Sequence, residues 1–228
     1  MKRYMLRFVL FLMIVGNANA DIVAHWDMYG QPGDQVSTAA VDDVANVTGL
    51  DMVRGNGLGT NTGANSLNSN GWDGIEAGDY IQFGFSVDPN YEVSLDELWI
   101  GTRSSNTGPG TIGFYSSLDG FANPFYTVTQ VGSDYANSII DISALGTISE
   151  DLYIRLYEFG DIQADGDGAT SSTGTFRITD HYDTGIYTDV QITGTVSPVP
   201  VPAAVWLLGS GLIGLVGFRR RNKKIQNN

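Results

Sequence analysis

The sequence contains no cysteine and few charged residues, and both absences exclude classes of function. Without cysteine there are no disulfide bonds, thiolate metal sites or cysteine nucleophiles. Only 16 % of the 228 residues are charged, and 12 basic residues compare with 25 acidic ones. Because nucleic-acid binding needs a basic surface, this balance argues against a nucleic-acid partner. Since 42 % of the residues are hydrophobic, the chain can still bury a sizeable core.

The few basic residues are concentrated at the two ends of the chain. Eight of the 12 lie within residues 1–7 or 219–224. Residues 21–196 contain four arginines and all 25 acidic residues, which gives this body a net charge of −21. The four arginines of the body are Arg54, Arg103, Arg155 and Arg177. We therefore consider the ends and the body separately.

Residues 1–20 have the pattern of a secretory signal peptide. A basic start is followed by an apolar run over residues 8–15, and Ala18 and Ala20 form a small-x-small cleavage site. The apolar run is too short for a lasting transmembrane helix. The pattern predicts export through the Sec translocon, with Asp21 as the first residue of the mature chain. The alternative, a buried helix, does not account for this order of basic, apolar and small residues.

Residues 203–218 contain no charged side chain and precede a basic cluster, residues 219–224. As a helix they would span roughly 24 Å, which suffices for a single transmembrane helix if the ~30 Å hydrocarbon core thins locally. The basic cluster would remain in the cytoplasm by the positive-inside rule. Pro200 and Pro202 keep the preceding segment extended, as a processing enzyme requires. The acidic body would then lie outside the cytoplasm.

Residues 197–224 resemble the PEP-CTERM sorting signal. The matching residues are Val199, Pro200, Val201, Pro202, Ala203, Ala204, Trp206, Gly209, Ser210, Gly211, Arg219, Arg220 and Arg221. The resemblance implies that exosortase, an integral membrane transpeptidase-like enzyme of Gram-negative exopolysaccharide producers, recognises and removes this tail. Val201 replaces the glutamate of the Pro-Glu-Pro motif, which leaves the exosortase subtype open. A simple C-terminal membrane anchor is the alternative.

The body, residues 21–196, has the pattern of an all-β domain. Short runs rich in β-branched and aromatic residues alternate with clusters of Gly, Asn, Asp and Ser, and no stretch sustains a helical period. Strands are predicted over residues 22–26, 79–87, 92–102, 111–116, 125–131, 138–142, 151–159, 173–179 and 185–196. This spacing predicts a jelly-roll-like β-sandwich. The sequences over residues 79–121, 155–157 and 190–196 also resemble a module found ahead of PEP-CTERM tails, which implies a β-sandwich without an assigned activity.

The segment from Gly49 to Gly74 differs from the rest of the body. It is rich in glycine and asparagine, so we expect a long exposed loop that ends at Trp72. The sequence also allows one helical turn over residues 41–47.

Acidic residues suggest two candidate cation sites. Asp161, Asp165 and Asp167 lie in one short loop, and carboxylates and free carbonyls are the ligands that Ca²⁺ prefers. The alternative for this loop is a solvated acidic turn. A second candidate site would join Asp27, near the first strand, to acids near the last strand, such as Asp189.

Three residues suggest a carbohydrate-binding site. Arg103 could hold a carboxylate or sugar hydroxyls beside a loop that contains Asp119. The alternative is an ion pair between these two residues, because four arginines compete among 25 acids. Trp72, on the expected exposed loop, could stack on a sugar ring.

The sequence offers no motif of a catalytic site. The only histidines, His25 and His181, lie beside no Gly-x-Ser-x-Gly elbow, and there is no His-Glu-x-x-His motif or P-loop. We therefore expect a non-enzymatic envelope or matrix protein, held briefly by its tail, processed by exosortase and located at the cell surface or within exopolysaccharide. The alternatives are a carbohydrate-binding module, with or without Ca²⁺, and a secreted hydrolase.

Overall fold

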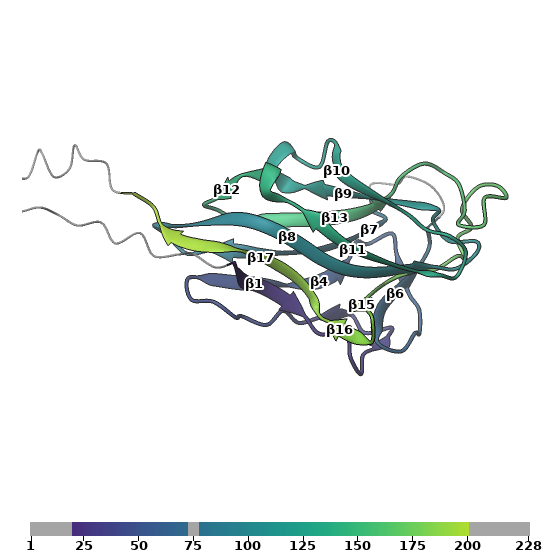
Figure 1. The fold of residues 1–228 in the computed structure, drawn as a ribbon. Helices are drawn as coiled ribbons and strands as arrows, with labels where there is room; N and C mark the ends of the chain where they lie inside the picture. The colour runs from purple at the N-terminus through teal and green to yellow at the C-terminus, as the bar shows by residue number, and fades with distance from the viewer. Residues whose placement is uncertain (1–19, 73–77, 201–228) are drawn as a thin grey trace, which may run out of the picture.

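The computed structural model describes residues 20–72 and 78–200, and these residues form an all-β fold of two main sheets (Figure 1). The nine-stranded sheet contains β1 (Asp21–Trp26), β2 (Pro32–Gly33), β5 (Gly59–Thr60), β6 (Ser66–Asn70), β8 (Tyr91–Ser104), β11 (Tyr135–Asp141), β12 (Thr147–Ile148), β14 (Phe176–Thr179) and β17 (Val190–Pro198). The six-stranded sheet contains β3 (Ser37–Thr38), β4 (Val47–Arg54), β7 (Tyr80–Val87), β9 (Thr111–Ser116), β10 (Pro124–Thr129) and β13 (Leu152–Glu158). The hairpin of β15 (His181–Asp183) and β16 (Ile186–Thr188) and two short 3₁₀ helices, η1 (Ser117–Asp119) and η2 (Ser143–Leu145), complete the fold.

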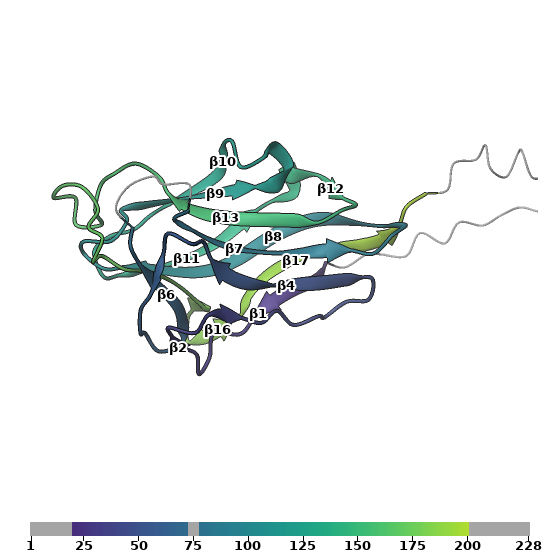
Figure 2. The ribbon, with the colours of Figure 1, turned by 180° about the vertical axis from the view of Figure 1, so that it is seen from behind.

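Strand β8 organises the nine-stranded sheet. It pairs with β17 and β14 along one edge and with β11 and β12 along the other. The remaining path runs from β14 through β6 to β2, and β1 pairs with β17. The six-stranded sheet, seen from behind in Figure 2, has the order β10-β9-β13-β7-β4-β3. The predicted all-β sandwich is confirmed, while the jelly-roll connectivity stays a prediction.

The core fills the space between the two sheets. Along β7, Ile81, Phe83 and Phe85 are fully buried, as their alternation predicts. Phe83 meets Trp26 of β1 with ring centroids 5.0 Å apart, so this edge-to-face pair joins the two sheets. Burial of each such side chain contributes about 1.5–3 kcal/mol to stability.

The expected loop from Gly49 to Gly74 is wrong, because this segment contains the end of β4 and the strands β5 and β6. Several of its polar side chains form hydrogen bonds within the protein. Asn68 Nδ2 donates to Thr62 O at 2.7 Å, and the Arg54 guanidinium donates to the carbonyl oxygens of Gly33, Gln35 and Asn68. Hydrogen bonds hold this segment in place of apolar packing, so its sequence lacks the hydrophobic pattern that would have predicted strands. Residues 41–47 form no helical turn.

The predicted signal peptide lies outside the described residues except for Ala20, and so do the predicted transmembrane helix 203–218 and the basic cluster 219–224. Within residues 20–72 and 78–200, no helix is long and apolar enough to cross a membrane. Asp21 of β1 pairs with Gly194 of β17, so both ends of the described chain lie at one end of the sandwich (Figure 1).

Candidate functional site

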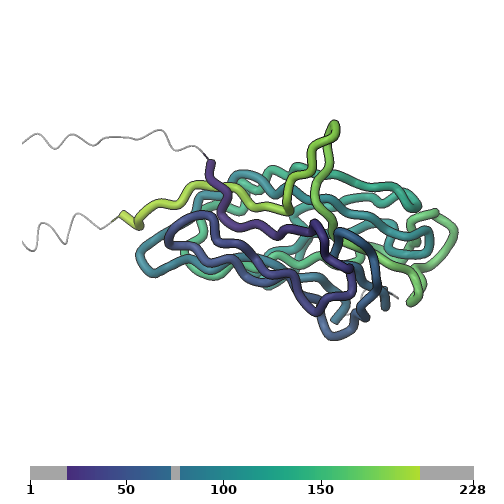
Figure 3. Tube along the Cα trace, turned by 90° about the horizontal axis from the view of Figure 1, so that it is seen from below, coloured from purple at the N-terminus to yellow at the C-terminus, as the bar shows by residue number. Residues whose placement is uncertain are grey.

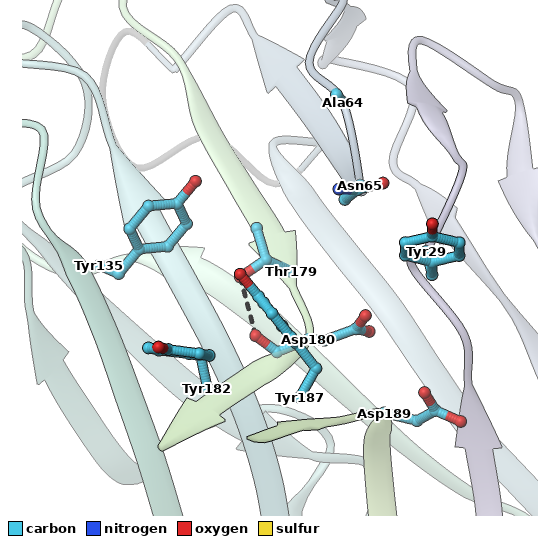
Figure 4. Close-up of a pocket in the computed structure, with 9 residues that line it drawn as sticks. All are labelled: Tyr29, Ala64, Asn65, Tyr135, Thr179, Asp180, Tyr182, Tyr187 and Asp189. Carbon is cyan, nitrogen blue, oxygen red and sulfur yellow. Dashed lines mark hydrogen bonds between the residues drawn. The ribbon is translucent and has the colours of Figure 1, made fainter. Parts of the chain in front are cut away.

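A cavity of about 580 Å³ opens on the outer face of the nine-stranded sheet. Its walls come from β11, from the end of β14, from the β15–β16 hairpin, and from the loops after β1 and before β6 (Figure 4). The lining residues are Tyr29, Ala64, Asn65, Tyr135, Thr179, Asp180, Tyr182, Tyr187 and Asp189. The cavity therefore combines aromatic rings with carboxylates and neutral polar groups.

Four tyrosines line this cavity and remain exposed. The exposed fractions are 79 % for Tyr29, 56 % for Tyr135, 43 % for Tyr182 and 73 % for Tyr187. Tyr182 and Tyr187 face each other across the hairpin with ring centroids 4.7 Å apart. Exposed aromatic groups gathered around a hollow are typical of a surface that contacts a partner or ligand.

The β15–β16 hairpin carries two of these tyrosines, and it has a tight turn at its tip and contacts with the sheet at its base. Its turn, Thr184-Gly185, has positive φ angles of 46° and 92°, as a tight two-residue hairpin turn requires. At its base, His181 is buried against Trp99, and Tyr182 N donates to Asn137 Oδ1 at 2.9 Å. Figure 3 shows the hairpin projecting from the sandwich.

Two carboxylates of the cavity lining, Asp180 and Asp189, lie close to a third, that of Asp27. Ligand oxygens of Asp27, Asp180 and Asp189 all lie within 4.8 Å of one another. Asp180 is buried, and it accepts a hydrogen bond from Met28 N at 3.0 Å. Burial raises the pKa of Asp180 to about 6, and the charges of Asp189 and Asp27 act in the same direction. Such a cluster of carboxylates can hold a hard cation such as Ca²⁺.

His25 lies between two carboxylates next to this cluster. Its Nε2 lies 3.3 Å from Asp189 Oδ2, and its Nδ1 contacts the carboxylate of Asp43. Burial raises the pKa of Asp189, although His25 opposes the shift. The predicted approach of Asp27 to Asp189 is confirmed, and the structure adds Asp180 to the pair.

The structure does not bring Asp161, Asp165 and Asp167 together as a cation site. Among the described residues, the only group of acids or histidines with metal-ligand spacing is the one at the cavity. Asp161 Oδ1 accepts a hydrogen bond from Thr170 N at 3.0 Å, and Asp165 Oδ1 accepts one from Asp167 N at 3.0 Å. The geometry is that of a solvated acidic turn.

Trp72 is fully buried, so the expectation that it is exposed for sugar stacking is wrong. Its ring lies edge-on to Phe176 with centroids 5.5 Å apart, and Nε1 donates to Ser69 O at 3.2 Å. Trp72 lies two residues after the end of β6 and enters the core, which the interpretation of this segment as a loop did not predict.

Arg103 and Asp119 form neither a shared pocket nor an ion pair. The described residues contain two contacts between acidic and basic side chains, and both involve His25. Arg103 Nε donates to Ser133 O, and its guanidinium lies 5.0 Å from the centre of the Tyr135 ring. Asp119 instead accepts hydrogen bonds from the backbone of Ala122 and Asn123, each at 3.1 Å.

The sequence reasoning missed the cavity tyrosines and Asp180. A signal was present for the hairpin, because Thr184-Gly185 separates two short runs that each contain a tyrosine. Tyr29 and Tyr135 carried no comparable signal, since they come from segments far apart in the sequence.

Residues 198–221 match the PEP-CTERM protein-sorting motif. This match confirms the resemblance proposed for the segment that follows β17. A search of the curated proteins and a search of the solved structures each found no match. The chain therefore carries a PEP-CTERM sorting motif, which marks it as an exported protein that exosortase recognises.

Proposed function

We propose that the protein is a non-enzymatic carbohydrate-binding protein of the envelope or extracellular matrix of a Gram-negative exopolysaccharide producer. Exosortase removes its tail after transient membrane anchoring, and the body then binds exopolysaccharide through the tyrosine-lined cavity. The observation that carries the proposal is the group of four exposed tyrosines around a cavity of about 580 Å³. A cavity of this volume is within the range of about 300–1,000 Å³ for small-ligand sites.

The cavity offers both kinds of contact that a sugar ring needs. The faces of Tyr182 and Tyr187 can pack against the apolar C–H face of a pyranose ring. Asn65 and Thr179 can exchange hydrogen bonds with hydroxyl groups, and the carboxylate of Asp189 can accept them.

The three neighbouring carboxylates favour a binding site that a cation assists. One ligand oxygen each of Asp27, Asp180 and Asp189 lies within 4.8 Å of the other two. Oxygen ligands gathered in this way can hold Ca²⁺ beside a bound sugar.

Affinity electrophoresis in gels that contain the exopolysaccharide of the producing organism tests the proposal. We expect the wild-type protein to be retarded, and we expect Tyr182→Ala and Tyr187→Ala each to weaken binding roughly 3- to 10-fold. Tyr126→Ala is a matched control, because Tyr126 is 41 % exposed but belongs to β10 of the other sheet. Equal retardation of all variants would refute the cavity as the binding site, and release of reducing sugar would favour a hydrolase.

A further inference from the structure

The outer face of the nine-stranded sheet carries a row of long polar side chains beside the cavity. The register pairs Asn68 with Arg177, Arg177 with Arg103, and Arg103 with Tyr135, across β6, β14, β8 and β11. Directly opposed residues of antiparallel strands point to the same face. Two of the four arginines of the body therefore lie side by side on one surface.

Neither arginine of this row is paired with a carboxylate among the described residues. Arg177 donates no hydrogen bond within this part of the chain, and Arg103 uses only Nε, toward Ser133 O. The other two body arginines are engaged differently: Arg54 donates to three backbone carbonyls, while Arg155 donates to Gln82 and Tyr157. Within the described residues, both terminal nitrogens of Arg103 and all donors of Arg177 therefore remain available to a ligand.

The two guanidinium groups also act on each other. Burial lowers the pKa of Arg177, and the neighbouring positive charge of Arg103 lowers it further. Like charges in directly opposed positions destabilise a sheet, and no acid of residues 20–72 or 78–200 forms a salt bridge with either arginine. An anion placed between the two groups would remove this repulsion.

Both arginines lie at the rim of the cavity. Their guanidinium carbons are 5.0 Å and 6.0 Å from the centre of the Tyr135 ring, which lines the cavity. Arg177 Nη1 lies beside Gly63, where an added Cβ would be only 3.2 Å away, and the next two residues, Ala64 and Asn65, also line the cavity. A ligand seated on Tyr135 would therefore meet both guanidinium groups.

We propose that Arg103 and Arg177 form an anion subsite at the rim of the cavity, which binds the carboxylate of an acidic sugar residue of the uronate class. The inference rests on the proposed function and names its substrate class. A planar guanidinium donates two parallel hydrogen bonds to a carboxylate, so two adjacent guanidinium groups can hold both of its oxygens. The carboxylates of Asp180 and Asp189 in the cavity lining repel the same group, which sets the direction in which an acidic sugar lies.

Calorimetric titration of the exported, processed protein with native and carboxyl-reduced exopolysaccharide of the producing organism tests this subsite. Carboxyl reduction converts uronates to neutral sugars and leaves sulfate and phosphate esters in place. We expect reduction to weaken binding to the wild type about tenfold or more. We expect Arg177→Gln and Arg103→Gln to weaken binding of the native polymer by a similar factor and to leave binding of the reduced polymer unchanged.

Arg155→Gln is the matched control, because it removes the same charge from β13 on the other sheet. Thermal unfolding of each variant verifies that it is folded.

Equal affinity of the wild type for the two polymers would overturn the subsite. The proposed function would remain intact if Tyr182→Ala still weakens binding of both polymers. An Arg177-dependent affinity that survives reduction would indicate an ester anion and would also overturn the uronate assignment. If binding depends on Arg177 but is unchanged in Tyr182→Ala, the result would support the subsite and contradict the proposed function. If the protein binds neither polymer, both proposals would be overturned.

Discussion

Asp180 has a buried carboxylate with two other carboxylates close by. One of its oxygens lies within 4.8 Å of an oxygen of Asp27 and an oxygen of Asp189, and the hydrogen bond from Met28 N offsets only part of the cost of its charge. A proton on Asp180 or a cation shared by the three residues would relieve the repulsion. The stability of the protein should therefore depend on pH and on divalent cations.

Asp180→Asn should stabilise the protein at neutral pH in the presence of a chelator. The pKa of Asp180 is raised from 3.8 to about 6, so the folded state holds this proton more tightly than the unfolded state does. The resulting stability is complete below about pH 4 and is lost as the pH rises to 6 and above. The full shift corresponds to ~3 kcal/mol, and solvent screening at a cavity wall reduces the expected gain to about 1–2 kcal/mol. Denaturant unfolding between pH 3.5 and pH 8 measures the difference between variant and wild type.

Calcium provides the control for this interpretation. We expect Ca²⁺ to raise the Tm of the wild type and of Asp165→Asn equally, and to have a smaller effect on Asp180→Asn. A constant difference between Asp180→Asn and the wild type across the whole pH range would show that repulsion at Asp180 is not the cause.

Individual site residues were predictable only where strand pairing determines their positions. Trp26, the last residue of β1, pairs with Val190, the first residue of β17. Asp27 follows β1 and Asp189 precedes β17, so these two residues necessarily come close. Asp180 and the tyrosines come from other elements, and their approach depends on how β14, β15 and β16 fold over the sheet. No local sequence pattern encodes that arrangement.

At the scale of single elements, the β15–β16 hairpin determines the shape of the cavity. Thr184 has a φ of 46°, a conformation that β-branched residues rarely adopt, whereas Asn accepts it readily. Thr184→Asn should therefore stabilise the protein by about 1 kcal/mol, which corresponds to a Tm increase of roughly 2–4 °C. Calorimetric unfolding measures this change.

Thr188→Asn is the control for the turn variant, because it introduces the same side chain into β16, within the same hairpin. Asn is disfavoured in strands, so we expect this variant to be neutral or destabilised. Stabilisation of both variants to the same extent would mean that the turn conformation is not responsible.

Strands with alternating apolar residues were predictable, and strands built from polar residues were not. β7 and β13 show the period of two in their sequences and in their burial patterns. β6, with the sequence Ser-Leu-Asn-Ser-Asn, is almost entirely buried although it is mostly polar. Arg54, a residue of β4, donates to the backbone carbonyl of Asn68 and to Ser69 Oγ in β6, and such long-range contacts leave no local pattern.

For the whole molecule, the first residue of the sorting motif lies far from the cavity. β17 has nine residues and begins just after Asp189 of the cavity, so its far end lies about 30 Å away. The sorting motif begins at that far end, at residue 198. Removal of the tail should therefore leave the cavity unchanged.

Intact-mass measurements on envelope and medium fractions test the processing step. With exosortase present, we expect a chain that has lost the residues after the Pro-rich motif, and in an exosortase deletion strain we expect those residues to be retained. Retention of the tail in both strains would contradict processing by exosortase. The same fractions should show equal polysaccharide retardation for processed and unprocessed chains.

The central claim is that carbohydrate occupies the tyrosine-lined cavity, and tyrosine nitration with and without exopolysaccharide tests it most directly. Peptide mass spectrometry gives the nitration rate of each exposed tyrosine in the wild-type protein. We predict that bound polysaccharide slows the nitration of Tyr29, Tyr135, Tyr182 and Tyr187 severalfold and leaves Tyr126, on the opposite sheet, unchanged. Unchanged rates at the four cavity tyrosines under conditions where the polymer binds, or equal protection of Tyr126, would contradict the claim.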